Sequence, residues 1–417
     1  MRAPSNGPAA SEELASRLYA AGAALLAVLP LAMVLANRSS PAVIGLAALA
    51  FLVGRVFEDR RTLAPRLLSP LRQPLGLAAL ACLAWCLVSF AWTPFPHASL
   101  RVLGEFLPIL VGAYLLACLA PGRIPAFAPR LAAGAILLAG LVIAVDLASD
   151  LALERALGHR VAAFVHNRPA LTLDLLAGPL ALVLWRARAR GLAVATLAFA
   201  ALGVLRSISG AAQLGLLAGA GLFSLAQLLP RRIGIGLAGL GLGFAVALAP
   251  VEGDLLAKVM PEAAHEHLVQ SSSRARVAIA RSFGAAVAAD PWRGAGYGTS
   301  ARFAETPVAG RVAPEMRVLL GVGHPHNSFL QVWAELGLPG ALLGALVLML
   351  MLGRIAAMPQ PDRAAALGLV AGATAIAFVE HNGWAAWWTA GLGAAITWMR
   401  EAAMSRADTR PEMDGPA

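Results

Sequence analysis

The chain has 417 residues, of which 59% are hydrophobic and only 13% charged, and its formal net charge is +10. A soluble domain usually carries about 25% charged residues, so this composition excludes an ordinary soluble globular protein. Runs of about 20 apolar residues, long enough to cross the ~30 Å hydrocarbon core of a bilayer, recur along the chain and predict an all-α integral membrane protein.

Twelve apolar stretches predict about twelve transmembrane helices. They lie at residues 18–36, 41–54, 74–93, 101–121, 127–147, 168–185, 191–205, 210–229, 233–250, 327–353, 364–379 and 383–399. One long polar loop separates the ninth stretch from the tenth. This pattern predicts three regions: a bundle of nine membrane helices over 1–250, an extramembrane loop with an amphipathic helix over 251–325, and three membrane helices with a cytoplasmic tail over 326–417.

The arginines favour one orientation of these helices. With both termini in the cytoplasm, 19 of the 33 Lys and Arg residues fall in cytoplasmic segments and six in the short outer loops. Because short cytoplasmic loops attract positive charge, topology explains the basic composition, and we expect no nucleic-acid partner. All eight histidines then lie on the outer side. That placement favours chemistry outside the membrane, although outer loops are generally polar in any case.

The long loop contains the predicted amphipathic helix. Ser271, Ser272 and Ser273 are good N-cap residues for it, and Asp290-Pro291 is a plausible stop. Its apolar face is expected to rest on the membrane surface. From His267 onward the loop holds seven arginines and only three acidic residues. That surplus predicts an anionic partner, which is either a phosphate-bearing substrate or the headgroups of anionic lipids.

Two histidine pairs in the loop are candidate metal ligands. The pairs are His265 with His267 and His324 with His326. Neither has the i, i+4 spacing of helical zinc motifs, and no acidic cluster accompanies them, so no metal site and no other cofactor is expected. The GAGYG sequence at 294–298 follows no strand and is interpreted as a tight turn rather than a nucleotide site.

The start of the tenth stretch carries the most specific pattern. His326-Asn327 is followed by nine residues and then by Gly337-Leu338-Pro339-Gly340, which resembles the histidine motif of the O-antigen ligase and polymerase family. The segment from Arg276 to Pro291, with its glycine-rich turn, is similar to a second segment of that family. The chain departs from the family pattern near Arg206: where family members often have a Ser-Arg pair, this chain reads LRSISG, and Arg206 stands three residues before Ser209.

The resemblance implies a glycosyltransferase of the bacterial inner membrane, with both termini in the cytoplasm and the active site in the periplasm. Its donor would be a glycan on undecaprenyl pyrophosphate. A ligase would transfer this glycan to a sugar hydroxyl of lipid A–core, and a polymerase would transfer it to another lipid-linked repeat unit. The implied partners are therefore the donor, the glycan or lipid A–core acceptor and membrane lipids. No metal is implied.

The resemblance also suggests roles for individual residues. His326 is expected to act as the general base and Arg276 to stabilise the pyrophosphate, at a separation of about 10–15 Å, because one transition state must touch both. Arg206, Arg274, His324 and Asn327 are expected to bind substrate, with helix capping as the other role open to Asn327. A transporter of lipid-linked material is disfavoured, because the charges cluster in one outer loop instead of along a mid-membrane path.

Overall fold

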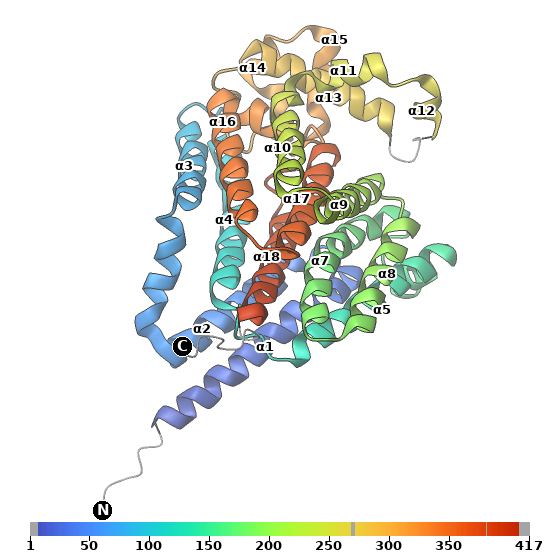
Figure 1. Cartoon of the computed structure of the whole chain (residues 1–417). Coiled ribbons are helices and arrows are strands. Elements are labelled where there is room, and N and C mark those ends of the chain that lie inside the picture. The colour runs from blue at the N-terminus through green and yellow to red at the C-terminus, as the bar shows by residue number, and fades with distance from the viewer. Residues whose placement is uncertain (1–6, 268–271, 381, 408–417) are drawn as a thin grey trace, which may run out of the picture. The chain divides into compact units, whose positions relative to one another are not determined.

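The computed structural model describes residues 7–267, 272–380 and 382–407, and the secondary structure within those ranges is helical (Figure 1). Its helices group into two compact units, each discontinuous in sequence. The first unit comprises residues 1–69, 107–216 and 386–417, and the second comprises 70–106 and 217–385. Each unit is described separately below.

The first unit is a bundle of long apolar helices. Its elements are α1 (Gly7–Leu35), α2 (Ser40–Leu71), the second half of α4 (Pro96–Leu119), α5 (Phe127–Ala148), α6 (Ala152–Ala156), η2 (Ala163–His166), α7 (Asn167–Arg186), α8 (Arg190–Arg206), the start of α9 (Gly210–Leu228) and α18 (Ala386–Ala407). Helix α5 packs between α1 and α8. A Cβ atom on Gly140 would lie 2.1 Å from the carbonyl oxygen of Phe199, so the missing side chain permits this close approach of α5 to α8.

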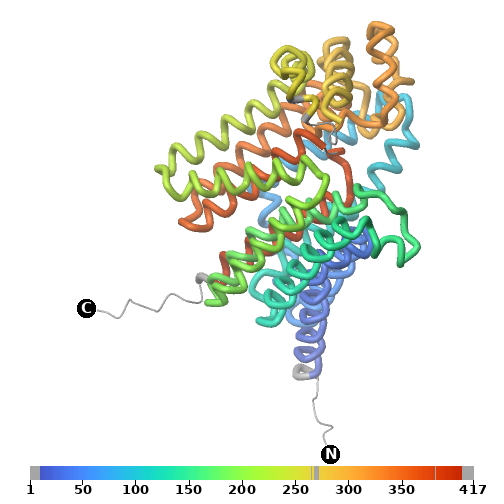
Figure 2. The backbone as a smooth tube through the Cα atoms, turned by 90° about the vertical axis from the view of Figure 1, so that its right-hand side faces the viewer, coloured from blue at the N-terminus to red at the C-terminus, as the bar shows by residue number. Residues whose placement is uncertain are grey.

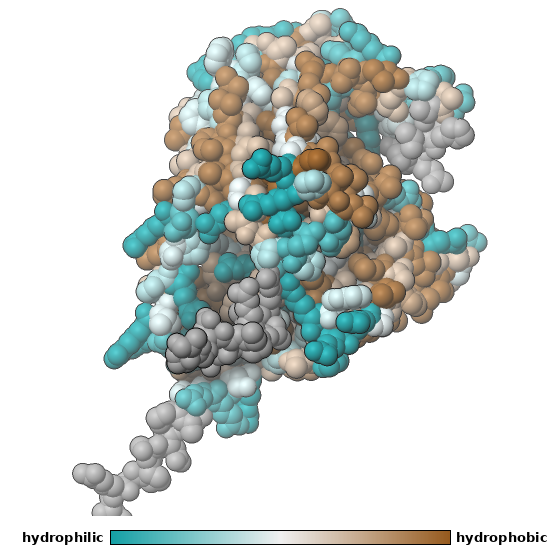
Figure 3. Space-filling view, in the orientation of Figure 1, coloured by the Kyte–Doolittle hydropathy of each residue, from teal (hydrophilic) through white to brown (hydrophobic). Residues whose placement is uncertain are grey.

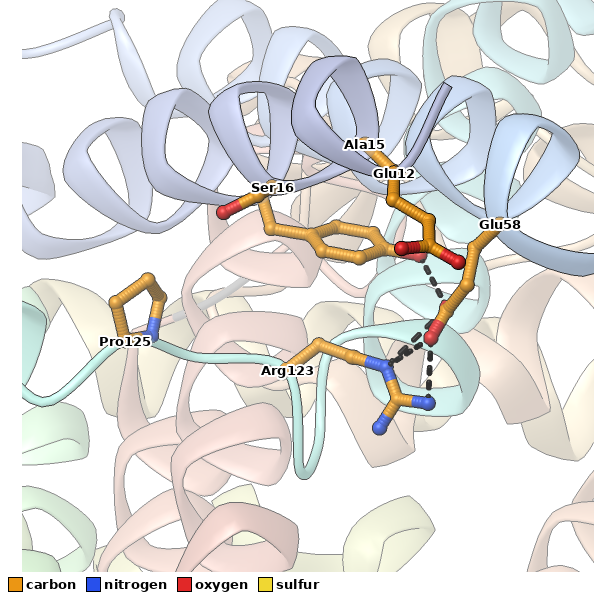
Figure 4. A pocket seen from close by; sticks show the side chains of 7 residues that line it. Glu12, Ala15, Ser16, Glu58, Arg123 and Pro125 are labelled. Atoms are coloured by element: carbon orange, nitrogen blue, oxygen red, sulfur yellow. Dashed lines mark hydrogen bonds and ion pairs between the residues drawn. The ribbon is translucent and has the colours of Figure 1, made fainter. Parts of the chain in front are cut away.

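Polar side chains link the middle of α1, the middle of α2 and the segment that follows α4. Helix α2 is kinked at Asp59, and its polar part continues to Leu71, well beyond the expected end at residue 54. Just before the kink, the carboxylate of Glu58 accepts hydrogen bonds from Tyr19 at 2.6 Å, Arg55 at 2.7 Å and Arg123 at 2.9 Å. Figure 4 shows Glu58 and Arg123 of this cluster at the wall of a small pocket. The ion pairs balance a charge that would be costly in the apolar bundle.

The second unit combines membrane helices with the long loop. Its elements are α3 (Pro74–Val88), η1 (Ser89–Ala91), α10 (Arg231–Ala247), η3 (Ala249–Val251), α11 (Glu252–Val259), α12 (Glu262–His267), α13 (Ser273–Ala289), η5 (Ser300–Glu305), α14 (Pro307–Gly310), α15 (Pro314–Arg317), η6 (Val318–Val322), α16 (Ser328–Ala356) and α17 (Asp362–Val379). Helix α10 packs beside α16 and α17, an arrangement that can be followed in Figure 2. Helix α3 packs against α16 as well.

The loop folds on its own apolar core. Helix α13 has the predicted bounds and ends before Asp290, while Ser271 lies outside the described residues. Its apolar side chains, including Ile279 and Phe283, pack with Phe303 and with Leu330 at the start of α16. The face expected to rest on lipid is therefore buried in protein. The prediction of lipid contact was wrong because helical periodicity identifies an apolar face but does not show whether lipid or protein covers it.

The apolar helices make this a multi-pass membrane protein, and the predicted helical fold class is confirmed. Each of the twelve expected stretches falls on a helix, and among the described residues nine helices are long and apolar enough to cross a bilayer. A tenth is added if α10 and the 249–259 segment, bent by 53°, form one span. The count of twelve and the three-region division by membrane position stay predictions. Figure 3 shows apolar side chains over much of the visible face, as lipid contact requires.

Candidate functional site

A break in α16 organises the site in the second unit. Gly337 interrupts the helix with φ of +62°, and a Cβ atom there would lie 2.4 Å from the carbonyl oxygen of Trp292. Two residues on, Pro339 has no N–H to donate. The carbonyl groups of residues 334–336 thereby lose their normal helical partners. In an apolar environment each unpaired carbonyl would cost several kcal/mol, on the order of 2–7.

The glycine-rich turn supplies the missing donors. Ala295 N–H donates to the carbonyl of Ala334 at 2.9 Å, and Gly296 N–H donates to that of Glu335 at 2.8 Å. The Trp85 indole donates to the carbonyl of Leu336 at 2.9 Å. The glycines of the turn, at 294, 296 and 298, all have positive φ. The glycine-rich turn at 294–298 and the glycine motif at 337–340, which are separate in the sequence, are thus joined by hydrogen bonds. The expected tight turn at 294–298 is present.

Glu335 holds the same turn through its side chain. This residue is fully buried, and its carboxylate accepts hydrogen bonds from Gly298 N–H at 2.6 Å and from both the N–H and the hydroxyl of Ser300. The Gln331 amide donates to it at 3.0 Å and the Trp384 indole at 2.7 Å. Five donors around one carboxylate make a rigid support for the first turns of α16.

Asn327 is the N-cap of α16. Its Oδ1 accepts the N–H groups of Phe329 at 2.8 Å and Leu330 at 3.1 Å, and its Nδ2 donates to Glu252 at 2.6 Å. Both ends of the amide are therefore engaged within the protein. Of the two roles left open by the sequence, these contacts support capping, while substrate binding stays a prediction.

The two histidines before this cap form a strained pair. His326 has φ of +56°, an unusual conformation for a residue with a side chain. Its backbone N–H donates to Nδ1 of His324 at 3.1 Å, and the two ring centroids lie 4.1 Å apart. Nδ1 of His326 is buried and has no hydrogen-bond partner among the described residues. Strain and an unpaired polar atom at one residue are more typical of a functional position than of a structural one.

The positive charge of Arg276 contributes to lower pKa values for both histidines. Burial, the repulsion from His324 when both imidazoles are protonated, and the charge of Arg276, in that order, lower the pKa of His326 to about 4. Burial and Arg276 also lower the pKa of His324. Both imidazoles are consequently neutral near pH 7, and an unprotonated nitrogen is what a general base requires.

The guanidinium of Arg276 itself reaches the end of α17. It donates to the carbonyl of Val379 and lies 3.5 Å from the carboxylate of Glu380. Burial raises the pKa of Glu380, while the charge and hydrogen bond of Arg276 act in the opposite direction. The sequence alone does not indicate a partner for Glu380. Its pairing with Arg276, 104 positions away, emerges only from the fold.

Most other arginines of the loop are paired within the protein, so fewer of them are free to bind an anion than the sequence predicts. Arg274 pairs with Glu262, Arg281 with Asp254, Arg302 with Glu305 and Arg311 with Asp290. Arg317 donates to two backbone carbonyls. The basic surface expected for the loop is thus largely neutralised within the protein. Arg206 is exposed at the end of α8 in the first unit, and its substrate-binding role stays a prediction, as does that of Arg274.

The helical break, the glycine-rich turn and the arginine–histidine arrangement all lie in one part of the chain. A family model described as O-Antigen ligase matches residues 195–345, which include Arg206, Arg276 and His326. This part of the chain is similar to that family, so the resemblance predicted from the sequence is confirmed. No curated protein matches the chain. The match indicates a glycosyltransferase-like enzyme that acts on lipid-linked glycans.

Proposed function

We propose that the protein is an O-antigen ligase, which transfers a glycan from undecaprenyl pyrophosphate to a sugar hydroxyl of lipid A–core. The reaction would take place at the periplasmic face of the bacterial inner membrane, with both chain termini in the cytoplasm. The observation that carries the proposal is the effect of Arg276 on the two histidines, which brings a permanent cation and a neutral base into one site.

In the proposed step, the acceptor oxygen attacks the anomeric carbon and the bond from that carbon to the pyrophosphate oxygen breaks. The acceptor proton passes to the imidazole of His326, and undecaprenyl pyrophosphate leaves with the bonding electron pair. A single displacement inverts the anomeric configuration. Negative charge grows on the leaving oxygen, and Arg276 stabilises that charge in place of a divalent metal.

Donor binding is expected to change the pKa of His326. A base works best when its pKa lies near the working pH, and about 4 is too low for that. A bound pyrophosphate carries negative charge and offsets the positive charge of Arg276. Donor binding is therefore expected to raise the pKa of His326 and to make it a stronger base only when the donor is present.

The direct test uses the purified full-length protein with a lipid-linked donor and a lipid A–core acceptor. We expect transfer within minutes of adding EDTA, with inversion at the anomeric carbon, while the melting temperature shows that the protein stays folded. Loss of activity from folded protein on EDTA addition, with recovery on adding Mg²⁺ or Mn²⁺, would contradict the metal-independent mechanism. Retention of configuration would contradict the single displacement.

A polymerase of the same family is the second candidate, because it would use the same donor and the same chemistry. The lipopolysaccharide of a deletion strain separates the two. Loss of all long-chain O-antigen with accumulation of lipid-linked polymer indicates a ligase, whereas core carrying a single repeat unit indicates a polymerase. A transporter of lipid-linked material is less favoured, and purified protein that moves donor across vesicles without transferring the glycan would support it.

A further inference from the structure

A second group of titratable side chains lies in the first unit and includes none of the residues used in the proposed reaction. Asp146 ends α5, Glu154 lies in the short helix α6, and His166 lies in η2 immediately before α7. The sequence scatters these residues over 21 positions without a recognisable motif. In the fold their ligand atoms all lie within 4.8 Å of one another.

Burial distinguishes this group from an ordinary acidic surface. Asp146 is 2% exposed, Glu154 5% and His166 0%. Two carboxylates in such an environment repel each other and lose hydration, so they need a compensating positive charge. Nε2 of His166 lies 2.7 Å from Asp146, and Nδ1 of His159 lies 3.1 Å from Glu154.

We propose that Asp146, Glu154 and His166 bind a divalent metal ion of the zinc class, which ties the connection between α5 and α7 to both helices. A divalent cation balances two carboxylates, and an imidazole with two carboxylates suits Zn²⁺ better than Mg²⁺. Ligand atoms around tetrahedral zinc are roughly 3.3 Å apart, which small side-chain rotations reach from the observed spacing. His159 is placed to complete the site, as a fourth ligand or as a hydrogen-bond partner of Glu154.

The metal would stabilise the fold and would not take part in the transfer. His326 and Arg276 belong to the second unit, whereas the three ligands belong to the first. Removing the ion is therefore expected to lower the melting temperature and to create no metal-dependent chemical step. The alternative for the same residues is a purely protonic arrangement, in which hydrogen bonds with His166 and His159, without a metal, satisfy the two carboxylates.

The experiment measures metal content and metal-dependent stability of the full-length protein in detergent. Cells are grown with added zinc, the protein is purified in metal-free buffer, and bound metals are quantified by mass spectrometry. The melting temperature is then followed during titration with ZnCl₂ and, separately, MgCl₂. We expect about one zinc ion per chain, and a melting temperature that rises with Zn²⁺ but not with Mg²⁺.

Substitutions of the proposed ligands test where the ion binds. Glu154→Gln and Asp146→Asn preserve shape and remove one ligand charge, and each is expected to weaken Zn²⁺ affinity at least roughly tenfold. Asp150→Asn, an exposed neighbour four residues after Asp146, is the matched control and should bind zinc as the wild type does. If Asp146→Asn does not fold, Glu154→Gln and the wild-type metal content still decide the question.

Two results would overturn the proposal. The first is wild-type protein without stoichiometric metal and without a zinc-dependent melting temperature, which would favour the protonic arrangement. The second is equal zinc binding by Glu154→Gln and the wild type, which would place the ion elsewhere on the protein.

Discussion

Two neighbouring regions at the start of α16 differ in how completely their polar groups are paired. Around Glu335 and Gly337, five donors meet one carboxylate, and the carbonyls freed by the helical break find new donors. Around His326, one residue combines a left-handed backbone, an unpaired buried nitrogen and a strongly lowered pKa.

This contrast distinguishes the residues that hold the site in place from the residues that carry out its chemistry. A fully paired network lowers the free energy of the folded state and fixes positions, whereas unpaired and strained groups are kept at some cost in stability. Substitutions in the first region should therefore mainly change stability. Substitutions in the second should mainly change turnover, and the predictions below test that division.

The largest effect is expected for Glu335→Ala. The substitution removes the acceptor of five buried donors, each of which would cost about 1–3 kcal/mol if it stayed unpaired, so we expect a total loss of roughly 3 kcal/mol or more in the free energy of unfolding. Denaturation of the protein in detergent measures this. The matched control is Glu315→Ala, because Glu315 is exposed in the same loop, and it should leave stability unchanged. Equal stability of Glu335→Ala and the wild type would show that Glu335 does not support the turn.

His326→Ala should affect the reaction instead. We expect turnover to fall by a factor of roughly 10² or more, because the general base is lost, while donor affinity and melting temperature stay close to wild type. Single-turnover rates and donor binding measure the two effects, with the exposed His97→Ala as control. A loss of donor binding as severe as the loss of turnover would make His326 a residue that positions substrate and would remove it as the base.

The sequence predicted the framework of this site because its signals are local. Apolar runs identify membrane helices whatever their neighbours are, and Asp290-Pro291 marks the end of α13 by backbone geometry alone. His326, Arg276 and the 337–340 motif were identified through their resemblance to the O-antigen ligase and polymerase family.

The partners of these residues could not be predicted, since they come from distant segments. The sequence could not reveal that Gly298 and Ser300, more than thirty positions upstream, donate to Glu335. A carboxylate inside an apolar helix is itself a signal, because it must be paired to be tolerated there. Applied to Asp146 in α5, that signal would also have pointed to a buried partner.

Arg276 should show a smaller and graded effect. Arg276→Ala is expected to weaken donor binding and turnover together, because pyrophosphate is present in both the ground state and the transition state. Arg276→Lys restores the charge but not the planar pair of donors, so about a tenfold deficit should remain. Donor binding and single-turnover rates are compared with those of Arg281→Ala, a control five residues further along α13 whose partner is Asp254. Wild-type donor affinity in Arg276→Ala would mean that another group holds the pyrophosphate.

The smallest effect is expected in the pH profile. A general base is active when unprotonated, so kcat/KM should fall as the pH drops through the pKa of His326 in the free enzyme. Because that pKa is lowered to about 4, the fall should begin well below the ordinary histidine range near 6.5. His324→Gln removes one of the charges that lower it and should therefore shift the acid limb to higher pH. The profile is measured with melting temperature as a check on folding at each pH. An acid limb near pH 6.5 in the wild type, unchanged in His324→Gln, would mean that His326 titrates as an ordinary exposed histidine, and the proposed effect of burial and neighbouring charge would be wrong.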